Sequence, residues 1–144
     1  MYFCEHTSSE STSDDHSKRN PHEAREITEV AKTFCQKGRV DPSKITVLCA
    51  YRGQVTEIIE RFKSSNVEAL SKIQVTTIDS FQGQENDIIL ISLVRGENKK
   101  IGFLSEKNRL CVALSRARCG VYLFGNRRTL TAARVTPNYW KVRI

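Results

Sequence analysis

Four short apolar runs alternate with stretches of helical periodicity along the chain, and this alternation constrains the fold more than any other feature of the sequence. The runs span residues 45–50, 73–77, 87–94 and 120–125. Most of their residues are apolar, which is typical of strands buried on both faces of a parallel sheet. Strands that alternate with helices at this spacing imply right-handed crossover connections. The sequence therefore predicts an α/β fold in one domain, with a parallel sheet covered on both faces and no internal repeat.

Local signals mark where the helices begin and end. Asn20 can cap a helix that has a proline at its first position and Glu23 at its third, and Gly38 is expected to end it. A third helix is expected over residues 105–118, and Asn126 can cap a short helix after the last strand. A second helix is expected directly after the first apolar run, which spans residues 45–50. Four of its residues should face the core: Val55, Ile58, Ile59 and Phe62.

The segment before the first helix is polar. Residues 1–4 are expected to form a short strand and residues 6–19 a flexible loop, because the loop has nothing to bury. We therefore expect a flexible segment over 1–19, a lobe over 20–134 and a tail over 135–144. Three widely spaced histidines in or near the loop are interpreted as solvated rather than metal-binding: His6, His16 and His22.

Length and composition exclude several classes of protein. A chain of 144 residues buries roughly two thirds of its unfolded surface, which is enough for a core without disulfides or metal. Its longest apolar stretch falls far short of the about 20 residues that a membrane helix needs. The acidic first segment does not suit a signal peptide or a transit peptide. We expect an intracellular protein, cytoplasmic or also nuclear, with no membrane partner.

The cysteines indicate neither a disulfide framework nor a metal site. There are five of them, an odd number, and no pair has CxxC or CxxH spacing. Cys35, Cys49 and Cys111 lie among apolar residues and are expected to pack as small hydrophobic side chains. This usage suggests a reducing compartment.

The net charge of +7 is unevenly distributed. Residues 1–94 carry 11 basic and 14 acidic side chains, whereas residues 95–144 carry 12 basic and 2 acidic ones. An excess of positive charge in one part of a chain suggests a tail that binds nucleic acid. We therefore expect a binding region in the last third of the chain.

Three polar segments follow predicted strands or helices, where ligands of α/β proteins tend to bind. They are residues 51–54, 76–85 and 108–118. Each has an alternative interpretation: Tyr51 and Arg52 could be a surface pair, the second segment a hydrogen-bonded turn, and the third a solvated helix end. In the functional interpretation, Arg116 follows a short apolar helix and presents a guanidinium that suits phosphate oxygens.

Several catalytic patterns are absent. The seven glycines form neither a GxxxxGK[ST] phosphate loop nor a GxGxxG fingerprint. All three histidines precede or begin the first helix, so a Ser/His/Asp triad is unattractive. On its own, the chain is not expected to hydrolyse a nucleotide.

In this order, the three polar segments resemble the second RecA-like lobe of superfamily 1 helicases, in particular the up-frameshift-type group. Residues 75–87, VTTIDSFQGQEND, resemble helicase motif V, and residues 108–118, NRLCVALSRAR, resemble motif VI. Residues 101–104, 20–24 and 51–54 match further motifs of the group. Within it, the NFX-type zinc-finger helicases are the nearest resemblance. A RecA-like three-layer sandwich with a mostly parallel sheet is the fold that this resemblance implies.

The resemblance implies a nucleotide role for five residues. Arg116 is similar to the arginine finger that reaches the γ-phosphate of ATP from across the cleft between two lobes. Glu85 would contact the ribose, while Gln82 and Gly83 would shape the loop between the nucleotide and the bound strand. Arg118 would join this nucleotide-binding group or brace motif VI.

A second set of residues would face the phosphates and sugars of single-stranded RNA or DNA. Such contacts do not depend on base sequence and weaken with salt. At residue 52 the group often has an acidic or small side chain, whereas this chain has an arginine. The expected set is Tyr51, Arg52, Gln54, Thr76, Thr77 and Ser80.

The resemblance also implies parts that this sequence lacks. ATP and Mg would be held mainly by a first RecA-like lobe, so we expect the chain to be an inactive fragment of an ATP-dependent helicase. A non-catalytic RNA-binding or protein-interaction module derived from such a lobe is the alternative from another class. An unrelated α/β domain with a basic tail is a third interpretation. RNA or DNA preference, polarity, unwinding and oligomeric state are left open.

Overall fold

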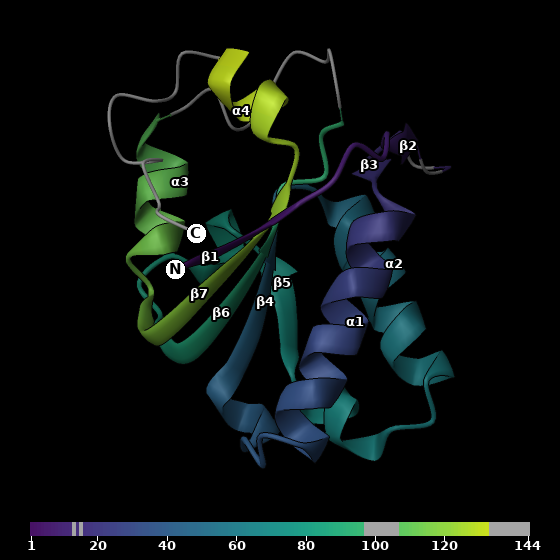
Figure 1. Ribbon diagram of the computed structural model, residues 1–144, viewed down its shortest axis with the longest axis vertical. Coiled ribbons are helices and arrows are strands. Elements are labelled where there is room, and N and C mark those ends of the chain that lie inside the picture. Colours follow the sequence, from purple (N-terminus) through teal and green to yellow (C-terminus); the bar gives the residue numbers. More distant parts are fainter. Residues whose placement is uncertain (13, 15, 97–106, 133–144) are drawn as a thin grey trace.

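In the computed structural model, residues 1–12, 14, 16–96 and 107–132 are described. Their centre is a five-stranded sheet in which every neighbouring pair of strands is parallel (Figure 1). All four apolar runs form strands, as predicted, and the expected strand at the start of the chain is confirmed as one edge of the sheet. Across the sheet the order is β1 (Tyr2–Glu5), β7 (Ala117–Gly125), β6 (Asn86–Ser92), β4 (Ile45–Cys49) and β5 (Gln74–Thr77).

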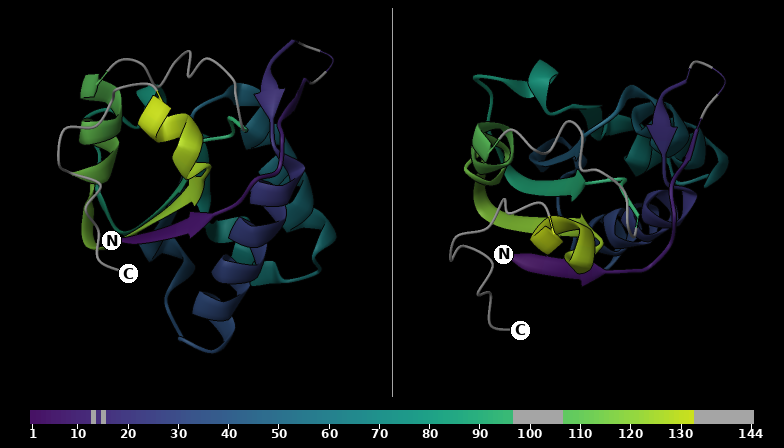
Figure 2. Two further views of the ribbon diagram at one scale, coloured as in Figure 1. Left: turned by 45° about the horizontal axis from the view of Figure 1, so that its top comes forward. Right: turned by 90° about the horizontal axis from the view of Figure 1, so that it is seen from above.

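Helices lie on both faces of this sheet. Helices α1 (Pro21–Gln36) and α2 (Arg52–Ser64) cover one face, and α3 (Lys107–Leu114) lies over the other (Figure 2). The crossover from β5 to β6, which contains a 3₁₀ turn at Asp79–Phe81, packs on the α3 face. The α/β class and the RecA-like three-layer architecture are therefore confirmed. Two further 3₁₀ turns, Pro42–Lys44 and Glu68–Lys72, precede β4 and β5.

The predicted helix signals hold for α1 and α2. The side chain of Asn20 accepts hydrogen bonds from the main-chain N–H groups of His22 and Glu23 and so caps α1. Beyond the last turn, a Cβ at Gly38 would lie 2.9 Å from the carbonyl oxygen of Phe34, so glycine suits that position. In α2 two of the four predicted core residues, Ile58 and Phe62, are buried, while Val55 and Ile59 are half-buried.

The predicted helix over 105–118 is too long. Its described part, α3, ends at Leu114, and β7 already begins at Ala117. The main-chain N–H of Asn86 donates to the carbonyl of Arg116 at 3.0 Å, and the parallel ladder between β6 and β7 starts there. Strand pairing with a distant segment therefore overrides the local helical pattern. The expected cap of the last helix is confirmed: Asn126 Oδ1 accepts the N–H of Thr129 in α4 (Arg127–Ala132) at 3.2 Å.

Two expectations about buried side chains need correction. Cys49 is fully buried, as predicted, but Cys35 is half-buried and Cys111 is exposed on α3. His6 is not solvated: its imidazole is 6% exposed and its Nε2 lies 2.8 Å from Glu23 Oε1. A buried carboxylate needs donors, and a histidine 17 positions away supplies one.

Much of the segment predicted as a loop contacts the folded lobe. Strands β2 (Ser11–Thr12) and β3 (Lys18–Arg19) form an antiparallel pair beside α2. The side-chain oxygen of Ser17 accepts the N–H of Gly53 at 2.8 Å, in the first turn of α2. The expected tail over 135–144 and the glycine at 102 lie outside the described residues. No helix of the described ranges is long and apolar enough to cross a bilayer.

Candidate functional site

The structure divides the predicted site residues between two ends of the sheet. Residues after β4 and β5 lie together at the carboxyl ends of their strands, because Cys49 pairs with Thr77. The starts of β6 and β7 lie at the opposite end, where Asn86 pairs with Ala117. We expected all three polar segments at carboxyl ends. The third is instead at the amino ends, because Arg116 directly precedes β7, and the second segment also ends there, because Glu85 directly precedes β6.

At the carboxyl ends, the side chain of Gln54 is hydrogen-bonded within the lobe. It is fully buried; its Oε1 accepts the N–H of Asn20 at 2.7 Å and its Nε2 donates to the carbonyl of Asn20 at 3.1 Å. In the free lobe the side chain of Gln54 therefore joins α2 to the start of α1, and its predicted contact with nucleic acid stays a prediction. Arg52 is exposed, and Tyr51 is half-buried against the core.

A pair of hydroxyl groups follows β5. Thr77 donates its hydroxyl to Ser80 Oγ at 2.8 Å, and the N–H of Ser80 donates back to Thr77 Oγ1 at 3.2 Å. These bonds close the turn that the sequence suggested as an alternative to a binding site. Ser80 is nevertheless exposed, and Thr76 and Thr77 are half-buried, so a polar ligand could reach this turn.

The crossover from β5 to β6 combines one anchor with an exposed loop. Phe81 is 2% exposed and anchors the loop in the core on the α3 side. Beyond it, Gln82, Gly83 and Glu85 are exposed. Gly83 has a φ of 81°, where other residues are strained, and a Cβ built there would meet no atom within 4 Å. The loop therefore presents its main chain to open space at this point.

A cleft of about 340 Å³ lies between this crossover and α3. Asp79 and Arg109 face each other across it, with 3.4 Å between Oδ1 and Nε. Gln82 and Val112 also line the cleft, and Val112 is 37% exposed. The cleft thus joins the motif V turn to the motif VI helix, two segments that the sequence separates by about 25 residues.

The main chain of Arg116 is held by hydrogen bonds on both sides. Its N–H donates to the carbonyl of Ala113 at 3.2 Å, and its own carbonyl accepts the N–H of Asn86 at 3.0 Å. Its Nε is buried but has no hydrogen-bond partner among the described residues. A buried donor without a partner is rare in native proteins and calls for an explanation, such as a catalytic role.

The guanidinium of Arg118 is hydrogen-bonded to two carboxylates. Its Nε donates to Asp87 Oδ1 at 2.7 Å and its Nη1 to Glu85 Oε1 at 3.2 Å. These hydrogen bonds, above all the one to Asp87, raise the pKa of the Arg118 guanidinium. Lys44 Nζ lies 3.9 Å from the other oxygen of Asp87. Of the two alternatives for Arg118, the contacts match the brace rather than a free phosphate ligand.

Sequence reasoning missed a buried carboxylate beside the carboxyl end of β6. Glu23 was interpreted only as a capping residue, but it is fully buried and accepts hydrogen bonds from the hydroxyl of Ser92 and the N–H of Val94. Val94 has a φ of 71°, which is unusual for a β-branched residue. No local pattern in the sequence could reveal contacts between residues about 70 positions apart.

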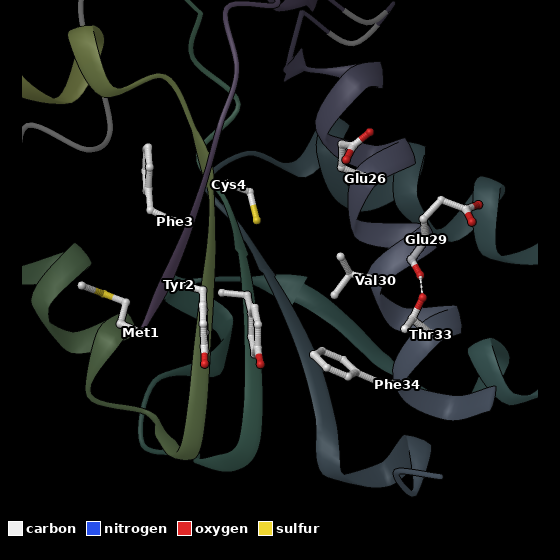
Figure 3. A pocket seen from close by; sticks show the side chains of 10 residues that line it. Met1, Tyr2, Phe3, Cys4, Glu26, Glu29, Val30, Thr33 and Phe34 are labelled. Atoms are coloured by element: carbon white, nitrogen blue, oxygen red, sulfur yellow. Dashed lines mark hydrogen bonds between the residues drawn. The ribbon is translucent and has the colours of Figure 1, made fainter. Parts of the chain in front are cut away.

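Another cavity lies away from these segments. A groove of about 560 Å³ runs between β1 and α1, and Figure 3 shows Tyr2 on one wall and Val30 and Phe34 on the other. The ring of Tyr122 stacks on that of Tyr2 at 5.0 Å and meets that of Phe34 edge-on at 5.1 Å. None of the predicted site residues lines this groove. The described residues contain no group of three side chains suited to a metal ion.

The fold and the position of these segments define a RecA-like lobe. A family model described as an AAA domain matches residues 1–128. The chain belongs to this family, and its fold and motifs are those of the second RecA-like lobe in the up-frameshift group of superfamily 1 helicases. The family resemblance inferred from motifs V and VI is thereby confirmed.

Curated relatives agree with this membership. The chain is 39% identical over 141 residues to "Helicase required for RNAi-mediated heterochromatin assembly 1" of Schizosaccharomyces pombe, covering 96% of this chain and 14% of the relative. It is 41% identical over 133 residues to "NFX1-type zinc finger-containing protein 1" of Homo sapiens, covering 90% and 7%. It is 37% identical over 115 residues to "Regulator of nonsense transcripts 1 homolog" of Neurospora crassa, covering 77% and 10%. The chain thus spans between 7% and 14% of the length of these relatives.

Proposed function

We propose that this chain is the ATP-closing lobe of a helicase that moves along single-stranded RNA or DNA. One observation carries the proposal: the buried Nε of Arg116 has no hydrogen-bond partner among the described residues, on a main chain bonded to the start of β6. The N–H of such a guanidinium can donate a hydrogen bond to a ligand that binds from outside the lobe. The γ-phosphate of ATP is a ligand of that kind, since its charge spreads over three oxygens during transfer.

On the nucleotide side, Arg116 acts as the arginine finger. The exposed loop at Gln82, Gly83 and Glu85 belongs to the crossover from β5 to β6. Its open main chain at Gly83 supports a close approach of the ligand. A first RecA-like lobe of the same protein supplies the phosphate loop and holds Mg.

On the nucleic-acid side, exposed or half-exposed groups at the carboxyl ends of β4 and β5 meet the strand. Arg52 provides charge, Tyr51 an aromatic ring, and the turn after β5 hydroxyl groups. Such a surface binds phosphates and sugars without reading bases. Gln54 supports it from beneath by joining α2 to α1. The proposed contact residues are Tyr51, Arg52, Thr76, Thr77 and Ser80.

The relatives' names add to this proposal. Two of them are described as a helicase and as a regulator of nonsense transcripts, and the helicase is required for RNAi-mediated heterochromatin assembly. RNA is therefore the first ligand to test, with DNA as the second. We also propose a location in the nucleus as well as the cytoplasm, since a task at heterochromatin is nuclear.

The rival proposal is a binding module that grips a strand without hydrolysing ATP. Hydrolysis of ATP by the complete protein separates the two, measured with and without single-stranded RNA or DNA at several salt concentrations. A motor gives hydrolysis that the strand stimulates and that salt weakens, because salt weakens strand binding. Strand binding without ATP hydrolysis above background would favour the module.

A further inference from the structure

A β-bulge lies beside the proposed nucleotide site. In the ladder between β6 and β7, Asn86 is opposite Ala117 but Ile88 is opposite Gly120. Two residues of β7, Arg118 and Cys119, therefore share the space opposite Asp87. Bulges increase the local twist of a strand and redirect its side chains, and they are frequent near active sites. Arg118 is one of the two residues of this bulge.

The bulge brings Arg118 against two carboxylates on a neighbouring segment. Nε contacts Asp87 at 2.7 Å and Nη1 contacts Glu85 at 3.2 Å, so one planar guanidinium joins both acids. Two neighbouring carboxylates would repel a phosphate group. Arg116 differs in this respect, because its Nε has no partner in the described part of the chain. Arg116 and Arg118 are therefore suited to different tasks.

The contact with Arg118 restricts the side-chain conformation of Glu85. Its side chain is 62% exposed, and it follows the loop at Gly83 where the main chain has a positive φ. A long exposed side chain loses rotamer freedom when a ligand fixes it. A partner that fixes it beforehand reduces that cost and improves binding. Asp87 is hydrogen-bonded to the same guanidinium and anchors it on β6.

We propose that Arg118 is a positioning residue: held by the bulge and by Asp87, it fixes the carboxylate of Glu85 to receive the sugar hydroxyls of the nucleotide. This inference rests on the proposed function, in which Glu85 contacts the ribose. It removes Arg118 from the phosphate ligands and gives it an effect on nucleotide binding rather than on the chemical step.

The test uses the complete protein and steady-state hydrolysis of ATP, 2′-deoxy-ATP and 3′-deoxy-ATP. Arg118→Ala is expected to raise KM for ATP about two- to fivefold, as suits the loss of the exposed ion pair that holds Glu85, and to leave kcat within about twofold. Glu85→Ala should reduce the preference for ATP over at least one of the two deoxynucleotides. Arg118→Ala should reduce the preference over that same deoxynucleotide. Added to Glu85→Ala, it should change neither quantity further, because both substitutions remove the same contact. Arg118→Lys should restore part of the preference.

Two results would overturn the inference. A fall in kcat of tenfold or more in Arg118→Ala, with an unchanged sugar preference, would make Arg118 a phosphate ligand. Equal KM and equal sugar preference in Arg118→Ala and the wild type, with an effect of Glu85→Ala, would show that Glu85 needs no partner. Failure of the proposed function looks different, since neither Arg116→Ala nor Glu85→Ala would then change ATP hydrolysis. Arg127→Ala, which removes an ion pair with Glu5 at 3.7 Å, is the matched control.

Discussion

The carboxylate of Glu23 accepts the main-chain N–H of Val94 at 3.0 and 3.1 Å, and Val94 has a φ of 71°. A β-branched residue in this conformation carries strain on the order of 1–3 kcal/mol, which the surrounding contacts must offset. Asn20 Nδ2 donates to the carbonyl of the same residue at 3.1 Å. Two residues at the start of α1 therefore fix the turn that follows β6, on the path toward motif VI.

Removal of the Glu23 carboxylate should destabilise the lobe severely. Glu23→Ala leaves the hydroxyl of Ser92 and the N–H of Val94 without an acceptor, and each buried unsatisfied group costs about 1–3 kcal/mol. We expect the free energy of unfolding, measured by urea denaturation, to fall by about 3 kcal/mol or more. Glu26→Ala on the exposed side of the same helix is the control, with an expected change of about 0.5 kcal/mol or less. Similar losses for both variants would contradict the role of the buried network.

The cysteines should differ in their reactivity with an alkylating reagent. Burial, with a further contribution from Glu23, raises the pKa of the Cys49 thiol well above its ordinary value, so at mildly alkaline pH it stays protonated and covered. Cys111 and Cys119 are exposed. Mass spectrometry after brief treatment with iodoacetamide at about pH 8.5 should find label on both exposed residues and none on Cys49. Label on Cys49 before unfolding in urea would contradict its burial.

The outline of the fold could be predicted because its signals are local. Apolar runs indicated β4 and β6, and Asn20 indicated the start of α1. Other features depend on partners far along the chain. The end of α3 is set by the pairing of Ala117 with Asn86, and the imidazole of His6 is buried because it meets Glu23. The same is true of the site: family motifs identified its residues, but not their partners.

Two neighbours at the start of α2 should respond differently to substitution. Gln54→Ala removes a buried side chain bonded twice to Asn20 and should lower the free energy of unfolding by about 1–3 kcal/mol. Arg52→Ala removes an exposed charge and should change stability by about 0.5 kcal/mol or less. In the complete protein, Arg52→Ala should weaken binding of single-stranded RNA, with a shallower dependence on salt. Unchanged RNA affinity and salt dependence would remove Arg52 from the proposed surface.

In the proposed function, Arg116 completes an ATPase site that is shared with another lobe. The most direct test of this claim is nucleic-acid-stimulated ATP turnover by the complete protein carrying Arg116→Ala, with Arg127→Ala as a folded control of equal charge. Because arginine fingers contribute factors of about 10³ or more, kcat should fall by at least about that factor, while the control keeps wild-type turnover. Turnover of Arg116→Ala within about threefold of the wild type would contradict the claim.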